Sequence, residues 1–196
     1  LQDCFGCLAP DVRVGHYQEP FGLAWLTSSK YLQLMPWPSS TTTFTPGYNA
    51  GVMFRSAAYG DRATGTLGFF GNTPGLMSDG KWEDGYGVTG RLSWLPWAPC
   101  DCKQWLLHLG VSASYRGGIS SVRFRSRAEF DIGPRLIDTE VIPASESILA
   151  SLELAFVYDR FNIQAELTGA SVDADAGTDP LFWGGYMLVD TGIQPK

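Results

Sequence analysis

Apolar and polar side chains alternate one by one along several stretches of this chain, and this alternation constrains the fold most strongly. The clearest stretch runs from Trp105 to Arg116. Its apolar positions are Leu107, Leu109, Val111, Ala113 and Tyr115, and its other positions are His108, Gly110, Ser112, Ser114 and Arg116. A period of two places successive side chains on opposite faces of a β-strand. Helical periodicity is nearly absent, so we predict an all-β antiparallel fold.

Ten stretches are predicted to form strands, each near the length of about 9–11 residues that a tilted strand needs to cross a bilayer. They cover residues 11–17, 49–58, 62–71, 86–95, 105–116, 121–129, 134–141, 147–158, 161–171 and 181–190. Tight turns at Gly60-Asp61 and Asp159-Arg160 contrast with long connections at 18–48 and 72–85. Short turns at one end and long loops at the other are typical of a transmembrane β-barrel. If 18–48 is extracellular, both tight turns fall on the periplasmic side, provided that 134–141 forms a strand.

Composition leaves two interpretations of these strands. Charged residues make up 17% of the chain, below the roughly 25% of an average soluble domain. No apolar run reaches the roughly 18 residues of a transmembrane helix, and a net charge of −6 disfavours nucleic acid as a partner. The first interpretation is a β-barrel whose outer face meets lipid, with aromatic residues near the strand ends at the level of the headgroups. These aromatic residues are Trp94, Trp97, Trp105, Tyr115, Tyr158, Phe161, Phe182 and Trp183. The alternative is a soluble or surface β-sandwich that binds a ligand or serves as a structural module.

The ends of the chain suggest a single partial domain over residues 1–196. The sequence starts at Leu1 without a methionine and stops at Lys196, shortly after a strand-like stretch. We therefore expect truncation at both ends.

Three arginines form the most informative polar pattern. A strand over 121–129 would place Arg123, Arg125 and Arg127 on one face, about 6.5–7 Å apart, opposite Val122 and Phe124. Arginine stays protonated, and its guanidinium forks onto two phosphate oxygens, so such a column offers successive sites to an anion in a narrow pore. An exposed edge strand whose arginines deter aggregation is the alternative.

Further basic residues fall on the polar faces of the predicted strands, together with three carboxylates. The basic residues are Arg13, Arg55, Arg91, His108 and Arg116, and the acidic ones are Glu129, Glu153 and Glu166. We take Arg91 and Arg116 as candidate pore-lining residues. The lumen of a barrel would then be mixed in charge, with a local basic sector.

The cysteines and histidines indicate no catalytic site. Cys4, Cys7, Cys100 and Cys102 form two close pairs, which an oxidising compartment would allow to form disulfides of undetermined connectivity; a zinc site is the alternative. His16 and His108 are the only histidines, and no nucleophile, base and acid arrangement or phosphate loop stands out. We predict no enzyme activity and no cofactor.

Several motifs, in order along the chain, resemble the phosphate-selective porins of the O/P family. Residues 15–22, GHYQEPFG, resemble the family's GxxKxPFG region, and residues 46–52, PGYNAGV, resemble its PGRNIGV. Residues 123–129, RFRSRAE, are similar to its RxRxRPE element, and residues 161–166, FNIQAE, to its FSLQAEY strand.

The resemblance implies a sixteen-stranded barrel in the bacterial outer membrane, of which this chain holds a central part. It implies contact with outer-membrane lipid, assembly of the full-length protein as a homotrimer, and passive diffusion of phosphate or other small anions. Arg123, Arg125 and Arg127 correspond to the family's arginine ladder. In porins a long loop such as 18–48 folds into the barrel and narrows it, which would direct Lys30 toward the permeating ion.

Overall fold

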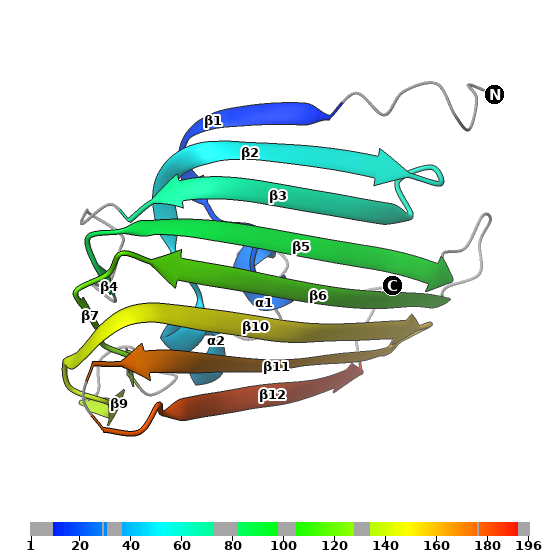
Figure 1. The fold of residues 1–196 in the computed structure, drawn as a ribbon. Helices are drawn as coiled ribbons and strands as arrows, with labels where there is room; N and C mark the ends of the chain where they lie inside the picture. The colour runs from blue at the N-terminus through cyan, green and yellow to red at the C-terminus, as the bar shows by residue number, and fades with distance from the viewer. Residues whose placement is uncertain are drawn as a thin grey trace.

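The computed structural model describes residues 10–28, 30, 37–72, 82–97, 105–127, 134–175 and 177–191. Within these residues, eight long antiparallel strands form one curved sheet, in which neighbours along the chain are neighbours in space (Figure 1). The strands are β1 (Asp11–Gln18), β2 (Tyr48–Ala58), β3 (Ala63–Gly71), β5 (Tyr86–Trp97), β6 (Trp105–Gly117), β10 (Ile142–Tyr158), β11 (Phe161–Ala174) and β12 (Leu181–Thr191). This arrangement confirms the antiparallel all-β prediction and eight of the ten predicted strands.

The shorter elements lie at one end of this sheet or on its concave side. They are α1 (Leu23–Leu26), α2 (Ser39–Phe44), β4 (Trp82–Glu83), β7 (Ser121–Val122), β8 (Arg125–Arg127) and β9 (Arg135–Asp138). We call the end with the tight turns at 59–62 and 159–160 the turn end, and the opposite end the loop end. β4 and β7 pair at the loop end, whereas β8 and β9 form a separate two-stranded ribbon there (β4, β7 and β9 are labelled in Figure 1). Neither described helix is long and apolar enough to cross a membrane.

The prediction of membrane-crossing strands at 121–129 and 134–141 is wrong. Among the described residues, the first stretch holds only β7 and β8, of two and three residues, and the second only β9, of four residues. A register shift between Ser126 and Arg127 interrupts the ribbon. The alternation at 121–127 instead reflects Val122 and Phe124, which are fully buried in the protein's own core. Because the two stretches leave the sheet as a pair, the turns at 60–61 and 159–160 still lie at the same end.

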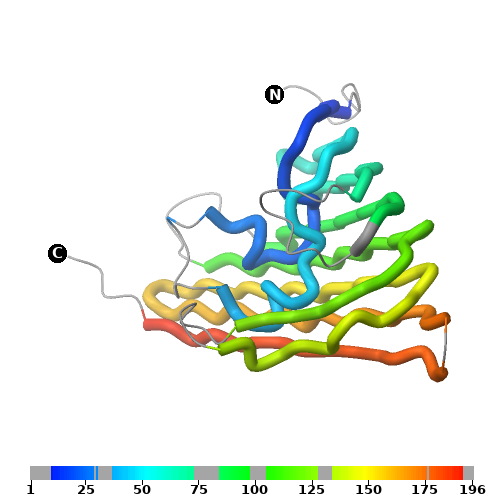
Figure 2. Tube along the Cα trace, turned by 90° about the vertical axis from the view of Figure 1, so that its left-hand side faces the viewer, coloured from blue at the N-terminus to red at the C-terminus, as the bar shows by residue number. Residues whose placement is uncertain are grey.

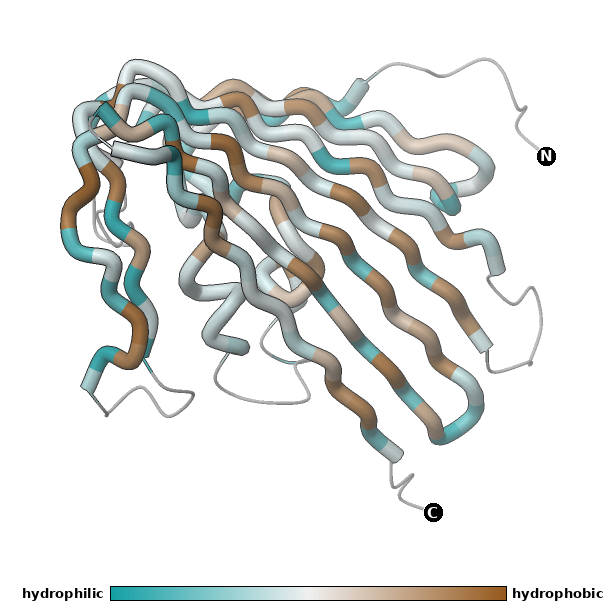
Figure 3. The backbone as a smooth tube through the Cα atoms, turned by 60° about the horizontal axis from the view of Figure 1, so that its bottom comes forward, coloured by the Kyte–Doolittle hydropathy of each residue, from teal (hydrophilic) through white to brown (hydrophobic). Residues whose placement is uncertain are grey.

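The two faces of the sheet differ sharply in polarity, as the alternating colours along each strand in Figure 3 show. Seven large apolar side chains on the outer, convex face are between 45% and 77% exposed. They are Val14, Leu67, Leu92, Val111, Leu152, Leu167 and Met187. Among the described residues no second sheet packs over this face, as a β-sandwich would require. An exposed apolar band of this extent is typical of a surface that meets lipid.

Aromatic residues gather at the turn end of the outer surface. Trp105 pairs in register with Tyr158, which pairs in turn with Phe161, and the rings of Trp97 and Trp105 lie 5.8 Å apart. Trp183 is exposed near the loop end. Phe182 departs from the predicted arrangement, because its ring packs against Phe124 on the inner side, with ring centroids 5.6 Å apart.

The inner, concave face carries the connection between β1 and β2, which we call the inner segment (residues 19–47). Figure 2 shows both helices of this segment inside the curve of the sheet. An apolar core forms where α2 meets the walls of β10, β11 and β12, and includes Phe44, Phe124, Leu149 and Val172. The expected inward folding of this connection therefore holds for its described residues, 19–28, 30 and 37–47.

Candidate functional site

The inner segment is fastened to the wall at its first residue by a buried ion pair. Glu19 and Arg116 are both fully buried, and the Arg116 Nη2 atom lies 2.5 Å from Glu19 Oε2. The side-chain amide of Asn49 donates to Glu19 Oε1 over 2.7 Å, and the hydroxyl of Thr89 donates to Oε2. The carboxylate that follows β1 thus contacts β2, β5 and β6.

Glycine makes the space that Arg116 occupies. A Cβ atom built at Gly87, on the neighbouring strand β5, would lie 2.2 Å from Arg116 Nη1. The same Nη1 atom donates to Asn72 Oδ1 over 3.0 Å. Arg116 therefore lies on the inner face as predicted, but it is enclosed beneath the inner segment and serves as an anchor in this structure.

A second fastening is made by a carboxylate of the wall. Glu166 of β11 accepts hydrogen bonds at Oε2 from the backbone N–H groups of Leu23 and Ala24, over 3.2 and 3.1 Å. Ser151 and Tyr186 donate to the same carboxylate over 3.1 and 3.3 Å. These bonds satisfy N–H groups in the first turn of α1 that have no partner within the helix.

Gly22 allows this close approach. Its φ angle of +73° lies in the region that favours glycine, and a Cβ there would lie 2.4 Å from Glu166 Oε1. Its N–H donates to Ser112 Oγ over 3.1 Å. The Pro-Phe-Gly motif therefore ends at a residue whose lack of a side chain is required for docking.

Arg91 also lies on the inner face, where it pairs with a wall residue. Its Nε and Nη2 atoms donate to Glu153 Oε1 and Oε2 over 2.9 and 2.6 Å. His108 Nε2 lies 3.2 Å from the same Oε2 atom. The expected mixed-charge inner face is present, and its charges are gathered into compact groups.

The three ladder arginines lie on one side of the segment that leads into the ribbon. The opposite side faces the wall, because Phe124 packs against Phe44 and Phe182 with ring centroids 5.6 Å apart in both pairs. Ser126 continues that side through a 2.8 Å hydrogen bond to Thr42. Alternation then directs the arginines away from the wall: Arg123 and Arg125 are partly exposed, and Arg127 is exposed.

The regular column expected from the sequence is interrupted. Arg123 precedes β8, and the register shift follows Ser126. Arg123 makes a two-point ion pair with Asp138 of β9, with N···O distances of 2.8 and 2.6 Å. These hydrogen bonds lower the pKa of Asp138 to about 2 and raise the pKa of Arg123.

The remaining predicted site residues are Lys30 and the four cysteines. Lys30 is exposed in the inner segment, four residues beyond α1. Cys4, Cys7, Cys100 and Cys102 lie outside the described residues, so their pairing stays a prediction.

Sequence reasoning missed the anchors themselves. The sequence singles out Glu19 and Asn49 only as parts of the family motifs, and Thr89 only as a residue of a predicted strand. The one available signal was the position of Thr89 on the polar face of its predicted strand, which does not indicate a partner.

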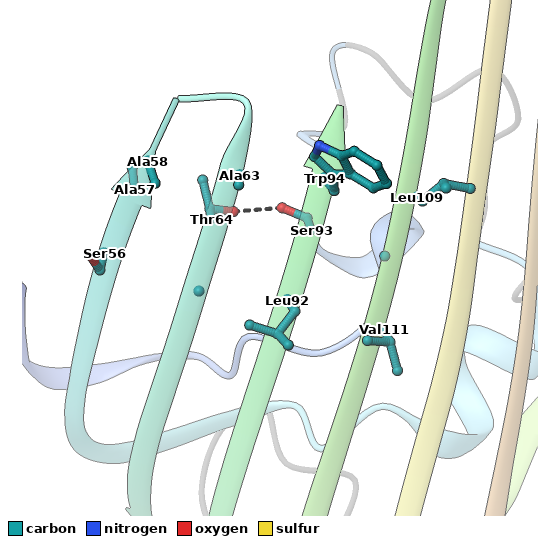
Figure 4. Close-up of a pocket in the computed structure, with 12 residues that line it drawn as sticks. Ser56, Ala57, Ala58, Ala63, Thr64, Leu92, Ser93, Trp94, Leu109 and Val111 are labelled. Atoms are coloured by element: carbon teal, nitrogen blue, oxygen red, sulfur yellow. Dashed lines mark hydrogen bonds between the residues drawn. The ribbon is translucent and has the colours of Figure 1, made fainter. Parts of the chain in front are cut away.

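A depression on the outer face differs in character from the inner face. It is lined by small residues of β2 and β3, among them Ala57, Ala63 and Gly65, and bordered by Leu92 and Trp94 (Figure 4). No ionisable side chain lines it. This depression therefore offers no charged group to an anion.

Together these features define a membrane-type β-sheet wall, apolar outside and polar inside, with a connecting segment folded onto its inner face. The chain belongs to the family described as Phosphate-selective porin O and P, which matches residues 9–190. The family is one of bacterial outer-membrane channels and not of enzymes. The match confirms the resemblance seen in the motifs.

A protein of Caulobacter vibrioides (strain ATCC 19089 / CIP 103742 / CB 15), described as an uncharacterized protein, is also similar. It is 35% identical over 112 residues, which cover 55% of this chain. The matched region covers 22% of the length of that protein.

Proposed function

We propose that this chain forms part of the wall and constriction of an outer-membrane porin through which small anions, phosphate in particular, pass by passive diffusion. The observation that carries the proposal is the position of Arg125 and Arg127, on the side of their segment that faces away from the wall. Membership of the porin family supports the same conclusion.

The placement of charge supports the ribbon as the source of selectivity. On the wall, Arg91 is paired with Glu153 and Arg116 with Glu19, so these arginines add little net charge. Residues 121–141 hold four arginines and four carboxylates and so have no net charge, but Arg123, Arg125 and Arg127 lie together on the side of their segment that faces away from the wall. Guanidinium groups gathered on one side of a narrow passage attract anions and bind phosphate oxygens in pairs.

The six basic residues predicted to line the pore each have a role in this proposal. Arg125, Arg127 and Lys30 contact the permeating anion. Arg123 adds its positive charge to the passage while it stays paired with Asp138. Arg91 and Arg116 shape the wall from which the constriction projects. The outer face contacts outer-membrane lipid, and the full-length protein forms the homotrimer that the family resemblance implies.

The test is ion selectivity of the full-length protein in planar bilayers. Reversal potentials in a potassium chloride gradient give the anion-to-cation permeability ratio. We expect Arg125→Gln combined with Arg127→Gln to lower this ratio severalfold and to weaken block of the chloride current by phosphate. Arg160→Gln, in the turn at the opposite end of the sheet, is the matched control and should leave the ratio unchanged.

Two outcomes would contradict the proposal. Unchanged selectivity in the double variant would remove the arginines from the mechanism. Absence of any channel from correctly folded full-length protein would favour a barrel that only anchors.

A further inference from the structure

The inner segment and the wall each contribute one buried carboxylate to the contact between them. Glu19 comes from the segment and enters a pocket of wall residues formed by Asn49, Thr89 and Arg116. Glu166 comes from the wall and binds the backbone of the segment at Leu23 and Ala24. Both carboxylates are nearly or fully buried. The beginning of the inner segment is therefore held by two contacts. In one the carboxylate belongs to the segment, and in the other it belongs to the wall.

The far end of the segment is held differently. There, α2 packs through Phe44 against Phe124, and Thr42 shares a hydrogen bond with Ser126. These contacts are apolar or involve neutral hydroxyl groups. Among the described residues of the segment, the contacts that depend on buried charge lie at its beginning, in residues 19–24.

We infer that Glu19, Arg116 and Glu166 are positioning residues that hold the inner segment against the wall and thereby set the width of the passage. The inference rests on the proposed function, in which this segment narrows a pore. None of the three side chains needs to touch the permeating ion, since all three are buried while the segment is docked against the wall.

Buried charge makes these contacts sensitive to a single substitution. Removing one partner of a buried ion pair leaves the other without compensation in a poorly solvated site. The least costly response is for the segment to detach, because detachment returns Glu19 to water. The strands that carry Arg116 and Glu166 have no comparable freedom, since β6 and β11 each have a paired strand on both sides.

The structure supplies a matched control in the pair formed by Arg91 and Glu153. This pair lies on the same inner face, and the Glu153 side chain is as fully buried as that of Glu19. Both of its members, however, belong to wall strands, β5 and β10. Breaking it should weaken the wall without freeing the segment.

Lys30 provides a readout that does not depend on ion flow. It is the only lysine or arginine in residues 19–47, so trypsin has a single site in the inner segment. Cleavage requires local opening of the chain around the site. The rate of cleavage after Lys30 in the full-length protein, folded in detergent, therefore reports how firmly the segment is docked.

We expect Glu19→Gln, Arg116→Gln and Glu166→Ala each to accelerate this cleavage about tenfold, the effect of losing a buried hydrogen-bonded partner. Glu166→Gln keeps an acceptor oxygen for the Leu23 and Ala24 N–H groups and should stay close to the wild-type rate. Glu153→Gln should also stay close to it. In bilayers, the three accelerating variants should show higher single-channel conductance and lower anion selectivity.

Equal acceleration in Glu153→Gln would overturn the inference, because general loosening of the wall would then explain the result. Wild-type cleavage rates in all three variants would overturn it as well. If a single variant at Glu19 or Arg116 fails to fold, the double variant Glu19→Gln with Arg116→Gln removes the stranded charge. Faster cleavage than in the wild type then supports the inference, and an unchanged rate contradicts it.

A failure of the proposed function would give a different combination of results in the two experiments. If the wild-type channel passes anions and cations equally while Glu19→Gln still accelerates cleavage, the anion proposal is wrong and the anchoring role stands. If anion selectivity is present but the cleavage rate is unchanged, the anchoring role is wrong and the proposed function stands.

Discussion

Arg91 and Glu153 meet across an intervening strand. They lie on β5 and β10, with β6 between them, and join through hydrogen bonds of 2.9 and 2.6 Å. The β6 residue opposite Glu153 is Gly110, where a Cβ would lie 2.4 Å from Glu153 Oε2. Strands two positions apart in a sheet are about 9.5 Å from each other. Arg91 and Glu153 can therefore meet only because both side chains are long and because Gly110 has no side chain between them.

The first prediction concerns Gly110. Gly110→Ala should lower the free energy of unfolding in detergent by about 1–3 kcal/mol, since the added methyl group pushes the Glu153 carboxylate away from Arg91. Gly90→Ala is the control, because the nearest atoms to a Cβ there are 3.8 Å away. Urea titration of the folded protein measures both. Equal effects of the two substitutions would show that Gly110 does not act through Glu153.

The second prediction separates the value of the ion pair from the cost of a stranded charge. Arg91→Met leaves Glu153 buried beside His108 alone and should lower the free energy of unfolding by about 2–4 kcal/mol. Adding Glu153→Met removes the stranded carboxylate, so the double variant should be more stable than the sum of the single effects by about 1–3 kcal/mol. Additive effects would contradict a direct coupling between the two side chains.

The long strands were predictable because alternation is a local signal. In β6 and β11 every second residue faces outward, and the sequence alone separates the two sets. The same signal misled at 121–129, because a period of two shows that one side of a segment is buried but not what covers it. At Phe124 the covering surface is α2 and β12, whereas the prediction placed lipid there.

The anchors were not predictable for a different reason. Glu19 and Arg116 are separated by 97 positions in the chain, and their contact depends on the register of five neighbouring strands. No local pattern encodes such a register. Gly87, which leaves room for Arg116, was likewise indistinguishable from any other strand glycine until the neighbouring strand was in place.

The third prediction concerns pH. Because the hydrogen bonds from Arg123 hold the pKa of Asp138 at about 2, below its ordinary 3.8, the pair contributes to ribbon stability above about pH 4. This contribution is lost as the pH falls through about 2. Protonation also removes a negative charge beside the arginines, so the anion-to-cation permeability ratio should rise between pH 4 and pH 2.

Asp138→Asn isolates this contribution. The variant should have a higher ratio than the wild type at pH 4, and a smaller rise on further acidification. Asp159→Asn, in the turn at the opposite end of the sheet, is the control for charge removal as such. A ratio in Asp138→Asn equal to that of the wild type at pH 4 would place the ribbon outside the ion path.

The fourth prediction tests which face of the sheet meets lipid. Leu154 on β10 points outward and pairs in register with Ala165 of β11. Gln164, which precedes Ala165 in β11, lies at nearly the same height on the inner face, where it donates to the Tyr186 hydroxyl over 2.6 Å. The two positions therefore differ in the face they occupy and very little in depth.

An arginine at these two positions should have unequal costs. Leu154→Arg places a charge against hydrocarbon and should destabilise the membrane-embedded protein by about 2–4 kcal/mol. Gln164→Arg places the same charge on the polar face, and should cost only about 1 kcal/mol for the lost hydrogen bond. Reversible unfolding from lipid vesicles measures both values. If Gln164→Arg proves the more costly substitution, the concave side is not the aqueous side, and the assignment of the arginine-bearing ribbon to an ion path fails with it.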